Sequence, residues 1–171
     1  MVVSAPDHPV DFHQLVDSSI NKPARYMGHE LGVEPRDWQA AQVRWALTYP
    51  EIYEVGSSNL GHIILYSILN AVPGQLCDRA YLPAADLAAR LREQEQALFG
   101  VESRRPLPAF DILGFSLSCG LGATNILEML DLCRVPLRAS DRGDLPLNEP
   151  AAPAWTSAGG RTATSDPAPY G

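Results

Sequence analysis

The segment YPEIYEVGSSNLGHIILYSILN, residues 49–70, decides the fold because it changes from a strand pattern to a helix pattern across one short loop. Residues 43–49 alternate apolar and polar side chains, which predicts a strand with one partly covered face. From about residue 59 to residue 71, apolar residues recur at helical spacing, and Ser57 or Ser58 is the predicted helix cap. This helix carries a broad apolar stripe that consists of Leu60, Ile63, Ile64 and Ile68.

The same order of strand, loop and helix recurs along the chain. A strand over residues 78–82 leads into a helix over 84–96, and an apolar strand over 111–117 leads into a helix over 123–133. The intervening residues 97–110 have room for a short third strand. Strands that alternate with helices indicate right-handed crossovers. The predicted fold class is therefore α/β, a flavodoxin-like or Rossmann-like parallel sheet with helices on both faces and residues 111–117 as its central strand.

Two of the loops are candidates for a ligand site, because ligands of parallel sheets bind beyond the carboxyl ends of the strands. The loops after Tyr49 and Leu117 both leave that edge and both precede a helix, whose free N–H groups can bind a polar group. We expect them to line the only cofactor-sized crevice, although both can equally be read as plain tight turns. The predicted cofactor-binding residues are Glu54, Val55, Gly56, Ser57, Ser58, Asn59 and Gly61 from the first loop, and Ser116, Ser118, Gly120 and Gly122 from the second.

The composition narrows the class of protein. The 171 residues, 46% of them hydrophobic, can bury one sizeable core. A formal net charge of -7 argues against a nucleic-acid surface, and no apolar window approaches the roughly 18 residues of a membrane span. We therefore expect a cytoplasmic protein that binds neither nucleic acid nor membrane.

The cysteines, histidines and serines of the sequence give little evidence for a catalytic or metal site. The three cysteines are too far apart for a metal site, and we expect Cys119 and Cys133 to be buried as small apolar residues. Each histidine, His62 included, is expected at the surface or in a helix cap. No catalytic or metal-binding residue is predicted, and a hydrolase built on Ser57 or Ser58 is disfavoured because no base can be named for it.

Four longer blocks carry a resemblance to a known family: KPARYMGHELG, ALTYPEIYEVGSSNLGHIILYSILN, VESRRPLPAFDILGFSL and GATNILEMLDLCRVPLRASDR. In order and spacing they resemble the N-terminal region of radical SAM proteins with a cobalamin-binding domain, an Fe-S oxidoreductase-like family of uncharacterised function. The resemblance covers roughly residues 22–142. It implies a cobalamin-binding-type domain in front of a radical SAM barrel that binds an iron-sulfur cluster and S-adenosylmethionine.

Two departures from the family pattern shape the expected function. The cluster motif C-x-x-x-C-x-x-C is absent. The resemblance therefore places the iron-sulfur cluster and S-adenosylmethionine in a missing downstream domain, a radical SAM barrel chain that would be the partner. The axial-imidazole motif D-x-H-x-x-G, laid over residues 56–61, would need Asp at Gly56 and His at Ser58. Cobalamin, or a related corrinoid, would then bind without a protein imidazole.

The expected organisation has three parts. An N-terminal arm over residues 1–38 precedes a cobalamin-binding-like α/β domain over 39–142 and a Pro/Ala-rich truncated tail over 143–171, whose last strand is poorly specified. Two functions follow. The chain is either the cobalamin-type module of a radical SAM protein, not an enzyme alone, or a catalytically inert interaction or remnant domain from a truncated or split gene.

Overall fold

The structure, a computed structural model, describes residues 8–142 apart from 29, 31, 32, 34, 35, 119 and 121. The predicted tail over 143–171, with its last strand, lies outside these residues, as does Cys119. The elements in chain order are α1 (Phe12–Leu15), β1 (Val43–Tyr49), α2 (Tyr53–Gly56), α3 (Leu60–Ala71), β2 (Gln75–Tyr81), α4 (Ala85–Glu93), β3 (Ile112–Phe115) and α5 (Gly122–Leu132), with short 3-10 helices at Pro23–Tyr26, Leu107–Ala109 and Ala139–Arg142.

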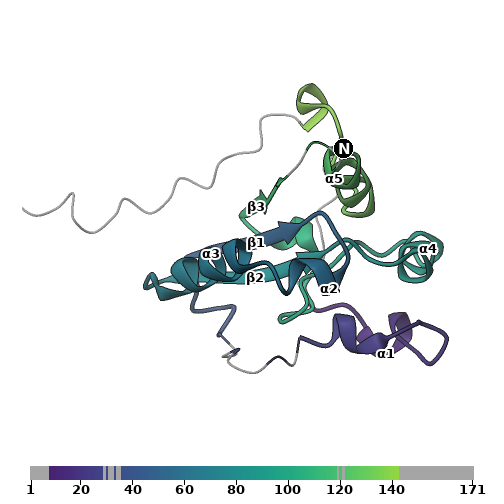
Figure 1. Ribbon diagram of the computed structural model, residues 1–171, viewed down its shortest axis with the longest axis horizontal. Coiled ribbons are helices and arrows are strands. Elements are labelled where there is room, and N and C mark those ends of the chain that lie inside the picture. Colours follow the sequence, from purple (N-terminus) through teal and green to yellow (C-terminus); the bar gives the residue numbers. More distant parts are fainter. Residues whose placement is uncertain are drawn as a thin grey trace, which may run out of the picture.

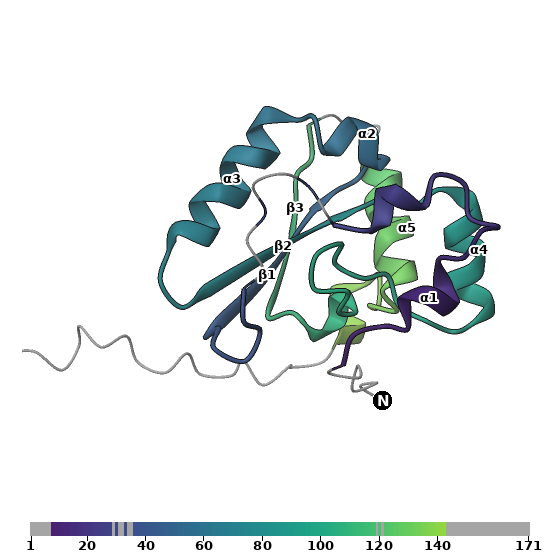
Figure 2. The ribbon, with the colours of Figure 1, turned by 90° about the horizontal axis from the view of Figure 1, so that it is seen from below.

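The three described strands form one parallel sheet in the order β2-β1-β3. Within it, Trp45 of β1 lies opposite Cys77 of β2 and Ile112 of β3. Helix α3 lies on one side of the sheet, and α1, α4 and α5 lie on the other (Figures 1 and 2). This arrangement confirms the predicted α/β class with a flavodoxin-like or Rossmann-like sheet. No helix in the described part of the chain is long and apolar enough to span a membrane.

The main core lies between the sheet and helices α1, α4 and α5. Small sheet residues, Ala46 and Ala80, let the fully buried Leu87, Leu91 and Met129 approach the strands closely. Each such large side chain contributes about 1.5–3 kcal/mol by leaving water. The predicted N-terminal arm belongs to the same core, and its buried side chains are Phe12, Leu15, Val16, Ile20, Tyr26 and Trp38.

The prediction that residues 111–117 form the central strand is wrong for the described sheet. The centre is β1, which pairs with β2 along its whole length and with β3 over four residues. Strand β3 is shorter than predicted, and all four of its residues are only partly buried. Its continuous apolar run reflects cover on both faces of the strand. Periodicity reports which faces are covered, whereas the place of a strand in a sheet depends on pairing with distant residues.

The other elements lie close to their predicted positions. The strand over 43–49 is confirmed, β2 begins three residues before the predicted residue 78, and α4 ends at Glu93 instead of 96. Residues 97–110, all of them described, form a single bridge between Phe99 and Pro106 in place of a third strand. Cys133 is buried, as expected.

Helix α3 meets the sheet with polar side chains. His62 and Asn70 are buried and Tyr66 is half-buried, while the predicted apolar stripe faces outward. The Asn70 side chain accepts from the backbone N–H of Cys77 and donates to its carbonyl, both at 2.9 Å. Because β2 is an edge strand of the described sheet, no described strand pairs with these two backbone groups, and Asn70 satisfies them instead.

Candidate functional site

A crevice of about 310 Å³ opens at the carboxyl edge of β1 and β3. It lies between the loop that follows β1 and the loop that follows β3, where ligands of parallel sheets bind. Its lining residues are Tyr49, Pro50, Glu51, Val55, Ser116, Leu117, Ser118 and Gly122. The two predicted loops therefore do meet at one edge of the sheet, and four predicted residues line the crevice: Val55, Ser116, Ser118 and Gly122.

A hydrogen-bonded chain connects this crevice to α3. The Tyr49 hydroxyl lies 3.2 Å from the Ser118 hydroxyl and accepts from the Asn59 side-chain amide at 3.2 Å. The side-chain oxygen of Asn59, Oδ1, accepts from the backbone N–H of His62 at 2.9 Å, and Asn59 thereby caps α3. The Ser116 hydroxyl lies 3.3 Å from His62 Nδ1. A ligand that binds these serine hydroxyls must therefore share them with Tyr49 and His62.

His62 is an interior residue, and the expectation of a surface or cap role is wrong. Its side chain is 1% exposed and lies between the rings of Tyr49 and Tyr81, at centroid distances of 5.4 Å and 5.8 Å. Burial, and then the charge of Arg79, lowers the pKa of His62 to about 4. The imidazole is therefore neutral near pH 7. The missed signal was the i, i+4 spacing of His62, Tyr66 and Asn70, which lie on one polar face of α3.

Protonation of His62 should destabilise the protein below pH 6.5. The pKa of His62 is about 4 in the folded chain and 6.5 in its ordinary state, so the unfolded chain binds more protons between these values. Stability contributed by His62 is thus present above pH 6.5 and falls by up to about 3 kcal/mol as the pH drops to 4. Urea unfolding from pH 7 to 4 measures the effect as the difference between the natural chain and His62→Gln.

The comparison with His62→Gln separates the contribution of His62 from that of Glu102. The pKa of Glu102 is raised to about 7, so its contribution to stability changes with pH in the opposite direction. Glu102 contributes stability that is present below pH 4.5 and is lost as the pH rises toward 7. An NMR titration of the His62 ring gives its pKa directly. A value near 6.5 would contradict the buried position.

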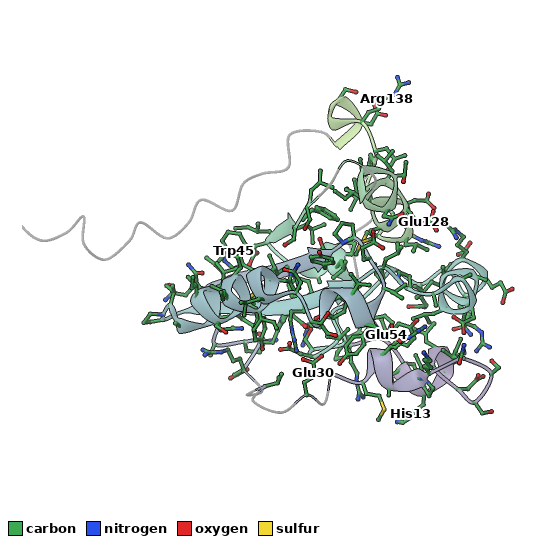
Figure 3. The ribbon with its side chains drawn as sticks, viewed as in Figure 1. His13, Glu30, Trp45, Glu54, Glu128 and Arg138 are labelled. Carbon is green, nitrogen blue, oxygen red and sulfur yellow. The ribbon has the colours of Figure 1, made fainter. Side chains whose placement is uncertain are left out.

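Glu54 lies away from the crevice. Its carboxylate accepts from Arg25 Nη2 at 2.7 Å and from Lys22 at 3.4 Å, and Figure 3 shows it on the side of the molecule where the N-terminal segment lies. These residues border a larger cavity of about 530 Å³, together with Ala24, Met27, Gly28, Glu30 and Tyr53. The expectation of a single cofactor-sized crevice is wrong, because the N-terminal segment packs beside the first loop and encloses this second space.

The first loop is more regular than predicted, because residues 53–56 form the single turn α2. Gly56 is buried, and a Cβ there would overlap the ring of Tyr81, so this glycine serves packing inside the domain. The Ser58 hydroxyl donates to the carbonyls of Glu54 and Val55 at 2.9 Å and 3.1 Å, which closes the end of α2.

The cap of α3 also differs from the prediction. Asn59 caps this helix in place of Ser57 or Ser58. The Ser57 backbone N–H instead donates to the Tyr53 carbonyl at 2.8 Å, at the end of α2. Gly61 and Gly120 are exposed, and a Cβ at Gly120 would meet no atom within 4 Å.

Beneath α3 lies an ionic cluster that the sequence patterns did not indicate. The Arg79 guanidinium pairs with Glu102 at 2.9 Å and with Glu30 at 2.6 Å, and it stacks on the Tyr66 ring at 4.6 Å. The Tyr66 hydroxyl donates to Glu102 at 2.8 Å, and the Tyr53 hydroxyl donates to Glu30 at 2.6 Å. Burial, and then the charge of Asp78, raises the pKa of Glu102 to about 7 despite the Arg79 cation. This cluster ties two loops and α3 to strand β2.

Within the described residues, three buried polar atoms lack a hydrogen-bond partner: His62 Nε2, Arg79 Nη2 and the Tyr81 hydroxyl. His62 belongs to α3 and the other two residues to β2, and none of the three lines the crevice. In the same described part of the chain, no group of three or more His, Cys, Asp or Glu side chains is placed to hold a metal ion.

One family model matches residues 61–170, and its description is "Radical SAM proteins, N-terminal". The match begins in α3 and includes β2, α4, β3 and α5, and therefore the second loop of the crevice. No curated protein and no solved structure matches the chain.

Proposed function

The chain belongs to the family of radical SAM proteins, whose N-terminal region it carries, and we propose that it is a cofactor-binding module of the cobalamin type. The observation that carries this proposal is the crevice at the carboxyl edge of a parallel sheet, bordered by Ser116, Ser118 and the first turn of α5. In this proposal the chain is not an enzyme alone. These 171 residues contain no C-x-x-x-C-x-x-C motif, so a radical SAM barrel outside them would supply the iron-sulfur cluster and S-adenosylmethionine.

The residues of the crevice fit one edge of a corrin ring. Gly122 keeps the opening clear, since a Cβ there would come within 3.1 Å of the Leu117 side chain. The exposed Val55 and Leu117 offer apolar contacts, and Ser116 and Ser118 offer hydroxyls to the ring amides. A corrinoid is larger than the crevice of about 310 Å³, so only part of it would be buried. When bound, it would supply a cobalt centre.

The positions of Ser58 and His62 support the proposal that cobalamin binds without an imidazole ligand from the protein. Ser58, at the place of the axial histidine, is exposed and donates its hydroxyl to two carbonyls of α2. His62 is buried beside Ser116, and its other ring nitrogen is enclosed between α3 and the sheet. Neither side chain is placed to reach a cobalt in the crevice, so we propose modest affinity and a spectrum without imidazole coordination.

Titration with hydroxocobalamin, followed by absorbance, tests the proposal. The natural chain should bind at micromolar to high micromolar concentration, without the spectral change that imidazole coordination causes. Ser118→Trp should abolish binding, because Ser118 lines the crevice and an indole at this position would fill its mouth. Ser118 is exposed, so the larger side chain should not disturb the fold. Glu93→Trp, a substitution at another exposed position at the end of α4, is the matched control and should bind normally. Substitution of Gly56 is unsuitable because its site is buried against Tyr81.

A second function, that of an interaction domain with an empty crevice, is favoured by one observation. The hydroxyls of Ser116 and Ser118 already lie within hydrogen-bond reach of His62 and Tyr49, so these polar groups of the crevice have partners without a ligand. Absence of hydroxocobalamin binding at high micromolar concentration would overturn the cofactor proposal and support this function.

A further inference from the structure

We propose that α3 is the contact helix of a homodimer and that its outer face packs against the same face of a second copy. Helix α3 presents most of its aliphatic side chains outward and turns His62, Tyr66 and Asn70 to the sheet, largely the reverse of an ordinary surface helix. Its exposed aliphatic residues, with Val72 just after it, are Leu60 (68% exposed), Ile63 (37%), Ile64 (48%), Leu65 (47%), Ile68 (56%) and Val72 (40%). We call these six residues the α3 face.

The α3 face has the shape that helix pairing requires. Leu60, Ile64 and Ile68 follow each other at a spacing of four residues and form one ridge along the helix. The exposed Gly61 and Ala71 are small and leave shallow grooves beside that ridge. Ridges of this spacing pack into the matching grooves of another helix at a crossing angle of about -50°. A face that carries both ridge and groove complements itself across a two-fold axis.

Charge also favours a second copy. Residues 60–72 contain no Asp, Glu, Lys or Arg, although 19% of the chain is charged. The net charge of -7 therefore does not place like charges opposite each other at this face. Depletion of charged residues is typical of the centre of protein interfaces, whereas a helix face exposed to water normally carries them.

The area suits a weak dimer. From their exposed fractions, the six residues present about 500–600 Å² of accessible surface, which is within the range of the largest apolar patch on a typical monomer. Ile63 and Leu65 lie on opposite flanks of the helix, so one helix–helix contact buries only part of this area. Two copies would bury at most about 1,000 Å² in total, the size of weak, transient interfaces. We therefore infer a weak dimer that dissociates in the micromolar range.

Sedimentation equilibrium of the 171-residue chain, from about 1 to 100 µM, tests this inference. The natural chain should form a dimer, and Ile64→Asp should weaken it by at least about tenfold because Ile64 lies at the middle of the ridge. The matched control is Leu127→Asp on α5, since Leu127 is 49% exposed against 48% for Ile64. This control should dimerise like the natural chain. Circular dichroism and thermal unfolding confirm that both variants are folded.

Other occupants of the α3 face give different results. A chain that stays monomeric at 100 µM overturns the proposal, as does a dimer that survives Ile64→Asp. If the chain is a monomer and Ile64→Asp lowers its stability, residues 143–171 of the same chain cover the face. If it is a monomer and Ile64→Asp leaves stability unchanged, the face is reserved for a different polypeptide such as a radical SAM barrel.

Discussion

Replacement of Arg79 by alanine should lower the free energy of unfolding by about 3–5 kcal/mol. The Arg79 side chain is 4% exposed, and its guanidinium pairs with Glu102 and Glu30. Without this cation, Glu102 is left as a buried carboxylate with Tyr66 as its donor, in a site whose burial already raises its pKa to about 7. A buried charge that loses its partner costs more than the pair itself contributes.

Two further variants make this test specific. Arg92→Ala removes an arginine that also pairs with two carboxylates, those of Glu128 and Asp131, but whose side chain is 48% exposed, so the loss should stay below about 1 kcal/mol. The double variant of Arg79→Met and Glu102→Met should recover part of the loss of Arg79→Met alone. The more deeply buried of the two carboxylates is then gone as well, and only Glu30, which is 26% exposed, stays without its cation. Urea unfolding measures all of them. Equal losses for Arg79→Ala and Arg92→Ala would show that the cluster does not stabilise the fold.

Asp78→Asn should lower the free energy of unfolding by about 2–4 kcal/mol, which is the second of the two largest effects that we expect. The Asp78 carboxylate is 1% exposed. One oxygen accepts from the backbone N–H groups of Arg79 and Glu102 at 2.7 Å and 3.1 Å, and the other accepts from the N–H and hydroxyl of Ser103 at 2.8 Å and 2.6 Å. An amide must turn its NH₂ group toward one of these pairs. The N–H groups of Arg79 and Glu102 both lose their acceptor in one orientation. In the other, the N–H of Ser103 loses its acceptor, while the Ser103 hydroxyl can rotate to accept from the amide. Relief of the buried charge offsets part of this loss.

The same variant should loosen one loop locally. Amide hydrogen exchange at Glu102 and Ser103 should become faster in Asp78→Asn, since Asp78 is what binds both N–H groups. Asp111→Asn is the control, because its carboxylate also accepts a backbone N–H, that of Arg44 at 2.8 Å, from a site that is 35% exposed. If Asp78→Asn lowers the free energy of unfolding no more than Asp111→Asn does, the buried Asp78 carboxylate does not stabilise the fold as proposed.

Much of the fold was predictable from sequence patterns within single segments. The alternation over residues 43–49 predicted β1 to the residue, and the helical spacing after it predicted α3 to within one residue. The repeated order of strands and helices predicted a parallel sheet, and parallel connection alone brings the loops after Tyr49 and Leu117 to the same edge. The positions of the strands and helices and the parallel connection together predict where the crevice lies. All of them could be predicted because they depend on residues that are close in sequence.

The side-chain contacts between α3 and the sheet were not predictable in this way. Arg79 pairs with Glu30, 49 residues away, and with Glu102, 23 residues away, and no periodicity relates them. His62 is interior because the polar face of α3, not its aliphatic face, meets β2. The sequence by itself therefore determined the elements, their order and the edge at which a ligand can bind, since local backbone preference and repeating patterns specify them. Only the tertiary structure decided which strand is central, which face of α3 is buried and which charges are paired, since these depend on contacts between distant segments.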